Sequence, residues 1–295
     1  MTAIAPLIIE AAISPFRAEA PVKDDQALLG EARASIAAGA SVIHFHHDTR
    51  LEPAESVAAL IEFSRKLLAD HPGVLLYPGI LGGSSSREHA AHLEPMAEAG
   101  VLGLAPLDPG ASVPYDLDAD GFPRGHGYVW NNFSTAKAVT AAMRQRGVPL
   151  TIGVYEPVQL RWALAAEAAG KLPAGTMVKL YFGGRSSLFD LGRPALNFGL
   201  PPTTQALDMY LAMMAGSRLT WNVGIMGDSL MRSPLARYAL ERGGHLRVGI
   251  EDIAETTDET NAGTVTAAAA LAAEVGRPVA TPVQAAALLG IGAHG

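Results

Sequence analysis

Short apolar segments alternate with longer segments of helical spacing along almost the whole chain, and this alternation restricts the fold more than any other feature. The first apolar segments are LIIEAA at 7–12 and VIHFHH at 42–47, and each precedes a stretch with apolar residues three or four apart. We count roughly eight such strand–helix pairs, which favours a (β/α)8 barrel of the α/β class, a TIM barrel, as a single domain over residues 1–295. An open, doubly wound sheet is the alternative.

Two stretches interrupt the alternation, at about 108–132 and 184–202. They are rich in Gly, Pro and polar residues, and we expect irregular excursions that lie near a site. Helix punctuation supports the seventh unit, because Asp228 stands where an N-cap is expected and Gly243-Gly244 where a helix is expected to stop.

Composition removes several function classes. The net charge of −7 gives no basic footprint, so we expect no nucleic-acid partner. The chain has no cysteine, which excludes disulfides and thiolate ligands, so a catalytic metal would need His, Asp or Glu. No GxGxxG follows the first strand and no P-loop is present, so nucleotide-binding folds have little support.

The N-terminal segment fits a first strand better than a signal peptide, since it lacks a cationic start and reaches Glu10 after a short apolar run. No run approaches the roughly 18 apolar residues of a membrane span. We therefore expect a cytoplasmic protein without a membrane partner.

The segment HFHH at 44–47 places histidines at the expected C-terminal end of the second strand, where barrels carry their chemistry. The period of two sends His44 and His46 to one side, while Phe45 and His47 face the other. We expect His47 to pack outside the barrel. The other histidines show no ligand spacing and are expected in loops or helices: His71, His89, His92, His126, His245 and His294.

The segment RVGIED at 247–252 offers the remaining parts of a metal centre. Arg247 and Glu251 lie at even spacing, hence on one face, and Asp252 follows at the turn. Catalytic zinc commonly takes three protein ligands, so Glu251 could complete a set with the two histidines. Glu156 is a third acidic strand end. An HxH motif alone is commonly a packed pair of histidines, and an Arg–Glu–Asp cluster alone is commonly a salt-bridged rim of the barrel. The presence of both at strand ends favours a metal site.

The chain also resembles a known family. PLIIEAAIS, GASVIHFH, VYE, HLRVGIED and GRPVATPVQAAALLGI resemble, in order and spacing, the β-keto acid cleavage enzymes of the 3-keto-5-aminohexanoate cleavage type. The resemblance covers nearly the full length, and its strongest pieces are HxH and RxGxED. It implies a zinc-dependent (β/α)8 enzyme, usually a homotetramer, that reacts a β-keto acid with acetyl-CoA to give acetoacetate and a new acyl-CoA.

The resemblance also implies roles for individual residues. His44, His46 and Glu251 match the zinc ligands, and Arg247 with Asp252 matches the dyad that removes a proton from C2 of the keto acid. The substrate-binding positions that it implies are Glu156, Asp108 and Arg17. Some members that accept aminated keto acids carry a Glu near position 17, so an arginine there favours a neutral or anionic tail.

The chain departs from the family pattern at three strand ends. Ile80-Leu81 replace a Ser-Thr pair, Pro106 replaces a Thr, and GIMGDS at 224–229 replaces a Gly-Ile-Gly-Arg-like loop. Ser84–Ser86 could supply the lost hydroxyls or cap the following helix. These departures weaken the expectation of the usual keto acid and of acetyl-CoA as substrates, while the residues expected to bind the metal are all present.

Other functions fit the same pattern. A metal-dependent lyase or aldolase could work without coenzyme A, a hydrolase could activate water, and a non-catalytic binding barrel could keep the fold alone. Two imidazoles and a carboxylate also suit iron, cobalt or nickel.

Overall fold

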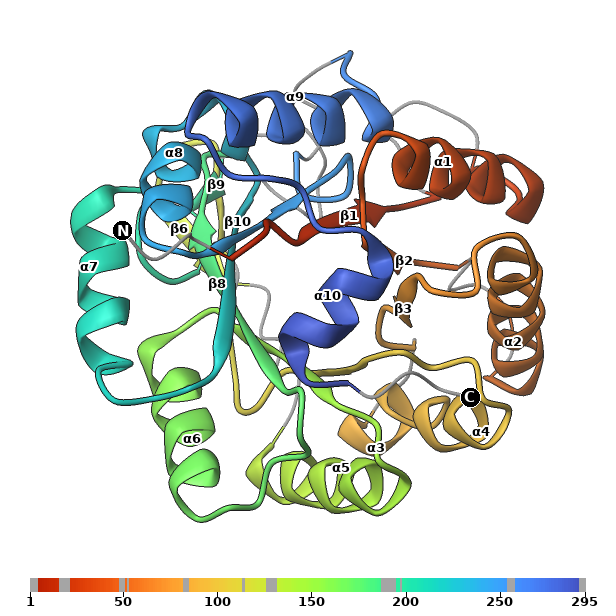
Figure 1. Ribbon diagram of the computed structural model, residues 1–295. Coiled ribbons are helices and arrows are strands. Elements are labelled where there is room, and N and C mark those ends of the chain that lie inside the picture. The colour runs from red at the N-terminus through yellow and green to blue at the C-terminus, as the bar shows by residue number, and fades with distance from the viewer. Residues whose placement is uncertain are drawn as a thin grey trace.

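Eight parallel strands curl into a nearly closed barrel with helices around it, as the alternating pattern predicts (Figure 1). The computed structural model describes residues 5–15, 22–47, 51, 53–81, 85–112, 115–125, 132–186, 195–196, 198–253 and 258–291. The barrel strands are β1 (Ile9–Ile13), β2 (Val42–Phe45), β3 (Leu75–Pro78), β4 (Ala105–Leu107), β7 (Leu150–Val154), β8 (Met177–Gly183), β10 (Thr220–Met226) and β11 (His245–Val248). They follow the order β3-β2-β1-β11-β10-β8-β7-β4. The Gly103 N–H donates to the Leu76 carbonyl at 2.9 Å, which brings the chain entering β4 against β3.

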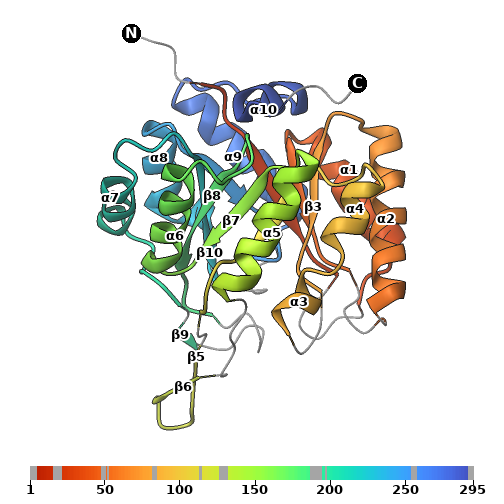
Figure 2. The same ribbon diagram turned by 90° about the horizontal axis from the view of Figure 1, so that it is seen from below.

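The helices form the outer layer. They are α1 (Asp25–Ala37), α2 (Pro53–Asp70), α3 (Ser86–His89), α4 (Leu93–Glu98), α5 (Phe133–Arg146), α6 (Pro157–Ala168), α7 (Thr204–Met213), the 3-10 helix η1 (Leu230–Arg232), α8 (Pro234–Glu241), α9 (Asn261–Glu274) and α10 (Pro282–Leu289). Helix α10 lies across the N-terminal end of the barrel (Figures 1 and 2). Among the described segments, no helix is both long and apolar enough to cross a membrane.

The apolar core lies between the strands and the helices. Ile9, Ile43 and Leu246 are fully buried there, on alternate positions of neighbouring strands. The inward positions between them are polar in several strands, with Glu10, Lys179 and Arg247 all at most 3% exposed. Because an isolated buried charge is costly, these side chains must satisfy one another inside the barrel.

The two stretches expected to be irregular carry a small sheet instead. Strands β5 (Tyr115–Leu117), β6 (Pro123–Gly125) and β9 (Ala195–Leu196) pair antiparallel in the order β6-β5-β9. This sheet projects from the end of the barrel opposite α10 (Figure 2). The turn between β5 and β6 is closed by Asp118, whose Oδ1 accepts the backbone N–H groups of Asp120 and Phe122 at 2.9 Å.

Three local predictions have clear outcomes. The prediction of Asp228 as an N-cap was wrong, because α8 begins at Pro234 and is capped by Ser233. Proline suits the first helical position, where its missing N–H is no loss. Helix α8 does stop before Gly243-Gly244. Ser85 caps α3 by accepting the Glu88 N–H at 3.3 Å, while Ser84 lies outside the described residues.

One histidine differs from the expectation of loop or helix. His245 opens β11, where its buried ring accepts the Ile8 N–H through Nδ1 at 2.9 Å and so links the first and last strands of the barrel. His126 and His294 lie outside the described residues.

Candidate metal centre and acid–base site

Strand β2 delivers two imidazoles to the inside of the barrel at its C-terminal end. His44 and His46 lie on one side of the strand, whereas Phe45 stacks on Phe63 of α2 at 4.4 Å between ring centroids. The expected alternation is therefore present. His47, on the outer side, is buried near His92 at the start of α4.

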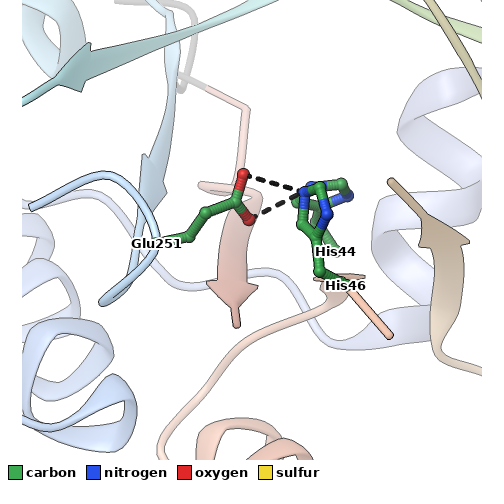
Figure 3. A group of neighbouring side chains, drawn as sticks. All are labelled: His44, His46 and Glu251. Atoms are coloured by element: carbon green, nitrogen blue, oxygen red, sulfur yellow. Dashed lines mark ion pairs between the residues drawn. The ribbon is translucent and has the colours of Figure 1, made fainter. Parts of the chain in front are cut away.

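Glu251 meets both imidazoles. Its Oε2 lies 3.1 Å from His44 Nε2 and its Oε1 lies 3.2 Å from His46 Nε2 (Figure 3). One ligand atom from each of the three residues lies within 4.8 Å of the others. The structure thus brings together the three residues that the sequence pointed to.

A glycine places Glu251 over β1. Gly249 has φ +136°, and a Cβ atom there would lie 2.2 Å from the Ala12 carbonyl oxygen. Only glycine tolerates both the conformation and the contact. The chain therefore turns tightly above β1, and the Glu251 N–H reaches the same carbonyl at 3.4 Å.

The donor set fits a divalent metal ion. Burial lowers the pKa of His44 to about 4, against the effect of Glu251, so its imidazole is neutral near pH 7. When the proton of the neutral imidazole is on Nδ1, His44 Nε2 and Glu251 Oε2 face each other as two acceptors at 3.1 Å. A cation between these atoms would resolve the mismatch, and two imidazoles with one carboxylate suit zinc.

The charges inside the barrel agree with this fit. When ionised, four carboxylates face two cations among the described inner residues: Glu10, Asp108, Glu251 and Asp252 against Lys179 and Arg247. A divalent ion would neutralise the remaining charge. Burial alone would raise the pKa of Glu251, but His44, Arg247 and His46 outweigh it and hold that pKa well below its ordinary value.

Arg247 and Asp252 form a two-pronged ion pair beside the three potential ligands. Nε donates to Oδ2 at 2.9 Å and Nη2 donates to Oδ1 at 2.9 Å, while Nη2 also donates to Glu251 Oε1 at 3.0 Å. Burial raises the pKa of Asp252 to about 6 although Arg247 opposes the shift. This arrangement holds a basic carboxylate in one orientation.

The other sequence candidates lie apart from these contacts. Asp108 follows β4 and hydrogen-bonds Tyr155; a Cβ on Gly153 would meet its Oδ1 at 2.2 Å. Burial raises the pKa of Asp108. Glu156 stands at the start of α6 and accepts the Gly199 N–H at 3.0 Å. Arg17 lies outside the described residues.

Sequence reasoning missed a buried polar group beneath Arg247. It consists of Glu10 on β1, Tyr77 on β3, Lys179 on β8 and Asn222 on β10, all at most 3% exposed. The available signal was a charge inside an otherwise apolar strand, as in LIIEAA and MVKLYFG. Such residues are almost never buried unless they are paired.

Gly79 offers a direct test of how His46 is held. A Cβ atom at this position would lie 2.2 Å from His46 Cε1. We expect Gly79→Ala to displace the imidazole and weaken zinc binding by roughly 10- to 100-fold, the usual effect of disturbing the surroundings of a ligand. Isothermal titration with zinc measures this. Gly30→Ala on α1, where a Cβ would meet nothing within 4 Å, is the control, and equal affinities would contradict the expectation.

Comparison with known proteins adds the family. A family model described as beta-keto acid cleavage enzyme matches residues 6–291. The 3-oxoadipate:acetyl-CoA acetyltransferase of Cupriavidus necator is 27% identical over 271 residues, which cover 88% of this chain and 84% of that protein. The 3-keto-5-aminohexanoate cleavage enzyme of Acetoanaerobium sticklandii is 36% identical over 100 residues, 32% of this chain and 36% of that enzyme.

Among solved structures, the ternary complex of ObcA with a C4-CoA adduct and oxalate aligns with a TM-score of 0.63 at 14% identity. The alignment covers 90% of this chain, which spans 66% of the ObcA chain. This likeness supports the barrel fold.

Proposed function

Because the chain belongs to the β-keto acid cleavage enzyme family, we propose that it reacts a β-keto acid with acetyl-CoA to give acetoacetate and a new acyl-CoA. The observation that carries this proposal is the meeting of two motifs from opposite ends of the sequence. The His44–His46–Glu251 group and the Arg247–Asp252 pair share one hydrogen bond, from Arg247 to Glu251 at 3.0 Å.

We propose His44, His46 and Glu251 as the ligands of a zinc ion. When bound, zinc would act as a Lewis acid that makes the C2 protons of the keto acid more acidic. Iron, cobalt and nickel accept the same donors. Elemental analysis of the purified protein identifies the ion.

Asp252 is the base in this proposal. Its carboxylate takes the C2 proton, and Arg247 keeps both oxygens oriented through the two hydrogen bonds at 2.9 Å. The C2 carbanion attacks the thioester carbonyl of acetyl-CoA, a C–C bond forms and the C–S bond breaks. The released thiolate attacks the original keto carbon, and cleavage of the C2–C3 bond gives the acyl-CoA and acetoacetate, whose C2 recovers the proton from Asp252.

Metal loading has an expected effect on stability, because the ion would neutralise buried charge. An ion that binds only the folded state at 100 times its dissociation constant adds about 2.7 kcal/mol. We expect the melting temperature to rise by roughly 5 °C on addition of zinc to the chelator-treated protein. Scanning calorimetry tests this, with magnesium, which prefers oxygen ligands, as the comparison. Equal melting temperatures with and without zinc would contradict the proposal that the folded protein binds the ion.

A lyase that works without coenzyme A is a second candidate, and the strand ends favour it. Leu81 and Pro106 are buried apolar residues at positions where the family resemblance implies hydroxyl groups. Asp228 lies in the loop that follows β10, where that resemblance implies a cation. Turnover of a β-keto acid without acetyl-CoA would support this candidate over the acyltransferase.

The family resemblance also implies a homotetramer, which remains part of the proposal. Light scattering of the purified chain measures the assembly directly.

A further inference from the structure

Glu10 is a buried carboxylate in the middle of the barrel. It lies on β1 directly beside Arg247 in the register of β11 and has 0% exposure. Oε1 accepts from Arg247 Nη1 at 2.7 Å and from the Tyr77 hydroxyl, and Oε2 accepts from Asn222 Nδ2 at 2.9 Å. Burial alone would raise the pKa of Glu10, but Arg247 and Lys179 outweigh it and lower that pKa, so the group is ionised near neutral pH.

The guanidinium of Arg247 transmits this contact to Asp252. Its Nη1 donates to Glu10, while Nε and Nη2 together donate to the two oxygens of Asp252. The group is planar and rigid, so fixing one edge fixes the direction of the others. Glu10 therefore restrains the orientation of Asp252 without touching it.

Tyr77 braces Glu10 and also contacts a proposed metal ligand. Its hydroxyl donates to Glu10 and lies 3.2 Å from Arg247 Nη1 and 3.0 Å from Lys179 Nζ, both of which donate to it. Its ring packs on the His44 ring at 4.5 Å between centroids. One side chain thus spans the potential metal group and the acid–base pair.

We propose that Glu10, braced by the Tyr77 hydroxyl, is the positioning residue that aligns Arg247 and Asp252 for proton removal at C2. This inference rests on the function proposed above. Neither residue needs to touch the substrate or the metal ion, and a displacement of Asp252 by about 1 Å can reduce a rate by about 100-fold.

Two variants test the proposal. Glu10→Gln keeps the shape of the side chain but removes its charge, and Tyr77→Phe keeps the ring on His44 and removes only the hydroxyl. We expect kcat for acetoacetate formation to fall about 100-fold in Glu10→Gln and about 10-fold in Tyr77→Phe, with KM for the keto acid within about threefold of the wild-type value. Bound zinc should equal that of the wild type. The rate of C2–H exchange in deuterated water, followed by NMR, should fall in parallel with kcat.

Tyr210→Phe is the matched control. Tyr210 is a buried tyrosine on the outer helix α7 (Figure 1), and its hydroxyl has no hydrogen-bond partner among the described residues. Its loss should leave kcat, KM and bound zinc unchanged.

Three outcomes would overturn the proposal. A lower melting temperature with unchanged kcat in Glu10→Gln would make Glu10 purely structural. A loss of zinc in parallel with kcat would place its role in assembling the metal site. A crystal structure of Glu10→Gln in which Arg247 and Asp252 keep their positions would remove the proposed mechanism. The crystal structure does not depend on turnover. It therefore tests whether Glu10 aligns Arg247 and Asp252 even if the wild-type protein proves inactive on β-keto acids and the proposed function fails.

Discussion

Glu251→Gln is expected to abolish metal retention and acyl transfer together. The amide removes the negative charge that faces His44 and His46 at 3.1 and 3.2 Å, and an amide is a weak ligand for zinc. We expect zinc affinity to fall by at least roughly 100-fold and activity to fall to background, since in the proposed mechanism the acidity of C2 depends on the Lewis acid. Metal content after gel filtration and acetoacetate formation are the two measurements.

The control for this variant is Glu274→Gln on α9. Glu274 forms a surface ion pair with Arg237, so the same chemical change there should leave metal content and activity at wild-type values. A Glu251→Gln protein that still retains one equivalent of zinc would remove Glu251 from the ligand set.

Asp252→Asn is expected to separate activity from metal binding. Asparagine keeps an oxygen that can accept from Arg247, but it cannot take a proton from C2. Loss of a general base commonly costs 10²- to 10⁴-fold, so we expect a fall of roughly 10³-fold in kcat with zinc content unchanged. Stopped assays for acetoacetate, together with C2–H exchange, measure both the overall reaction and the step assigned to Asp252.

Asp208→Asn on α7 serves as the matched variant. Asp208 accepts a hydrogen bond from Tyr238 on the protein surface, far from the metal group in the fold. Wild-type exchange rates in the Asp252→Asn protein would show that another group removes the proton, and the dyad assignment would then be wrong.

The fold was accessible from the sequence because its elements obey simple periodicities. Apolar strands such as LIIEAA and the helical stretches between them predict a (β/α)8 barrel, and the structure confirms it. The small β6-β5-β9 sheet was missed, since its strands are only two or three residues long. Its hairpin depends on the side chain of Asp118, which a composition rich in Gly and Pro does not reveal.

The candidate site was accessible in part. The period of two placed His44 and His46 on one face. The even spacing of Arg247 and Glu251 also suggested that they lie together, but β11 ends at Val248, and it is the turn at Gly249 that carries Glu251 over β1. Glu10 and Lys179 could not be assigned in the same way, because each is a single charge in an apolar strand. The contact of Glu10 with Arg247 follows from the strand register, which sets the two residues side by side across the first and last strands.

Glu156 shows that a residue can match a sequence motif while its observed contacts do not establish the predicted role. The sequence suggests an acidic strand end, but β7 stops at Val154, and Glu156 stands at the start of α6, where its carboxylate accepts the Gly199 N–H. Its assignment to substrate binding stays a prediction, as do those of Asp108 and Arg17.

The measurement that tests the central claim most directly is acetoacetate formation by the zinc-loaded protein. Acetyl-CoA would be supplied with β-keto acids that carry neutral, anionic or cationic tails, and the chelator-treated protein would be assayed in parallel. We predict zinc-dependent acetoacetate and a matching acyl-CoA with one class of tail, the neutral or anionic class. No acetoacetate from any of these acids, despite bound zinc and intact acetyl-CoA, would contradict the assignment of the barrel as an acyltransferase.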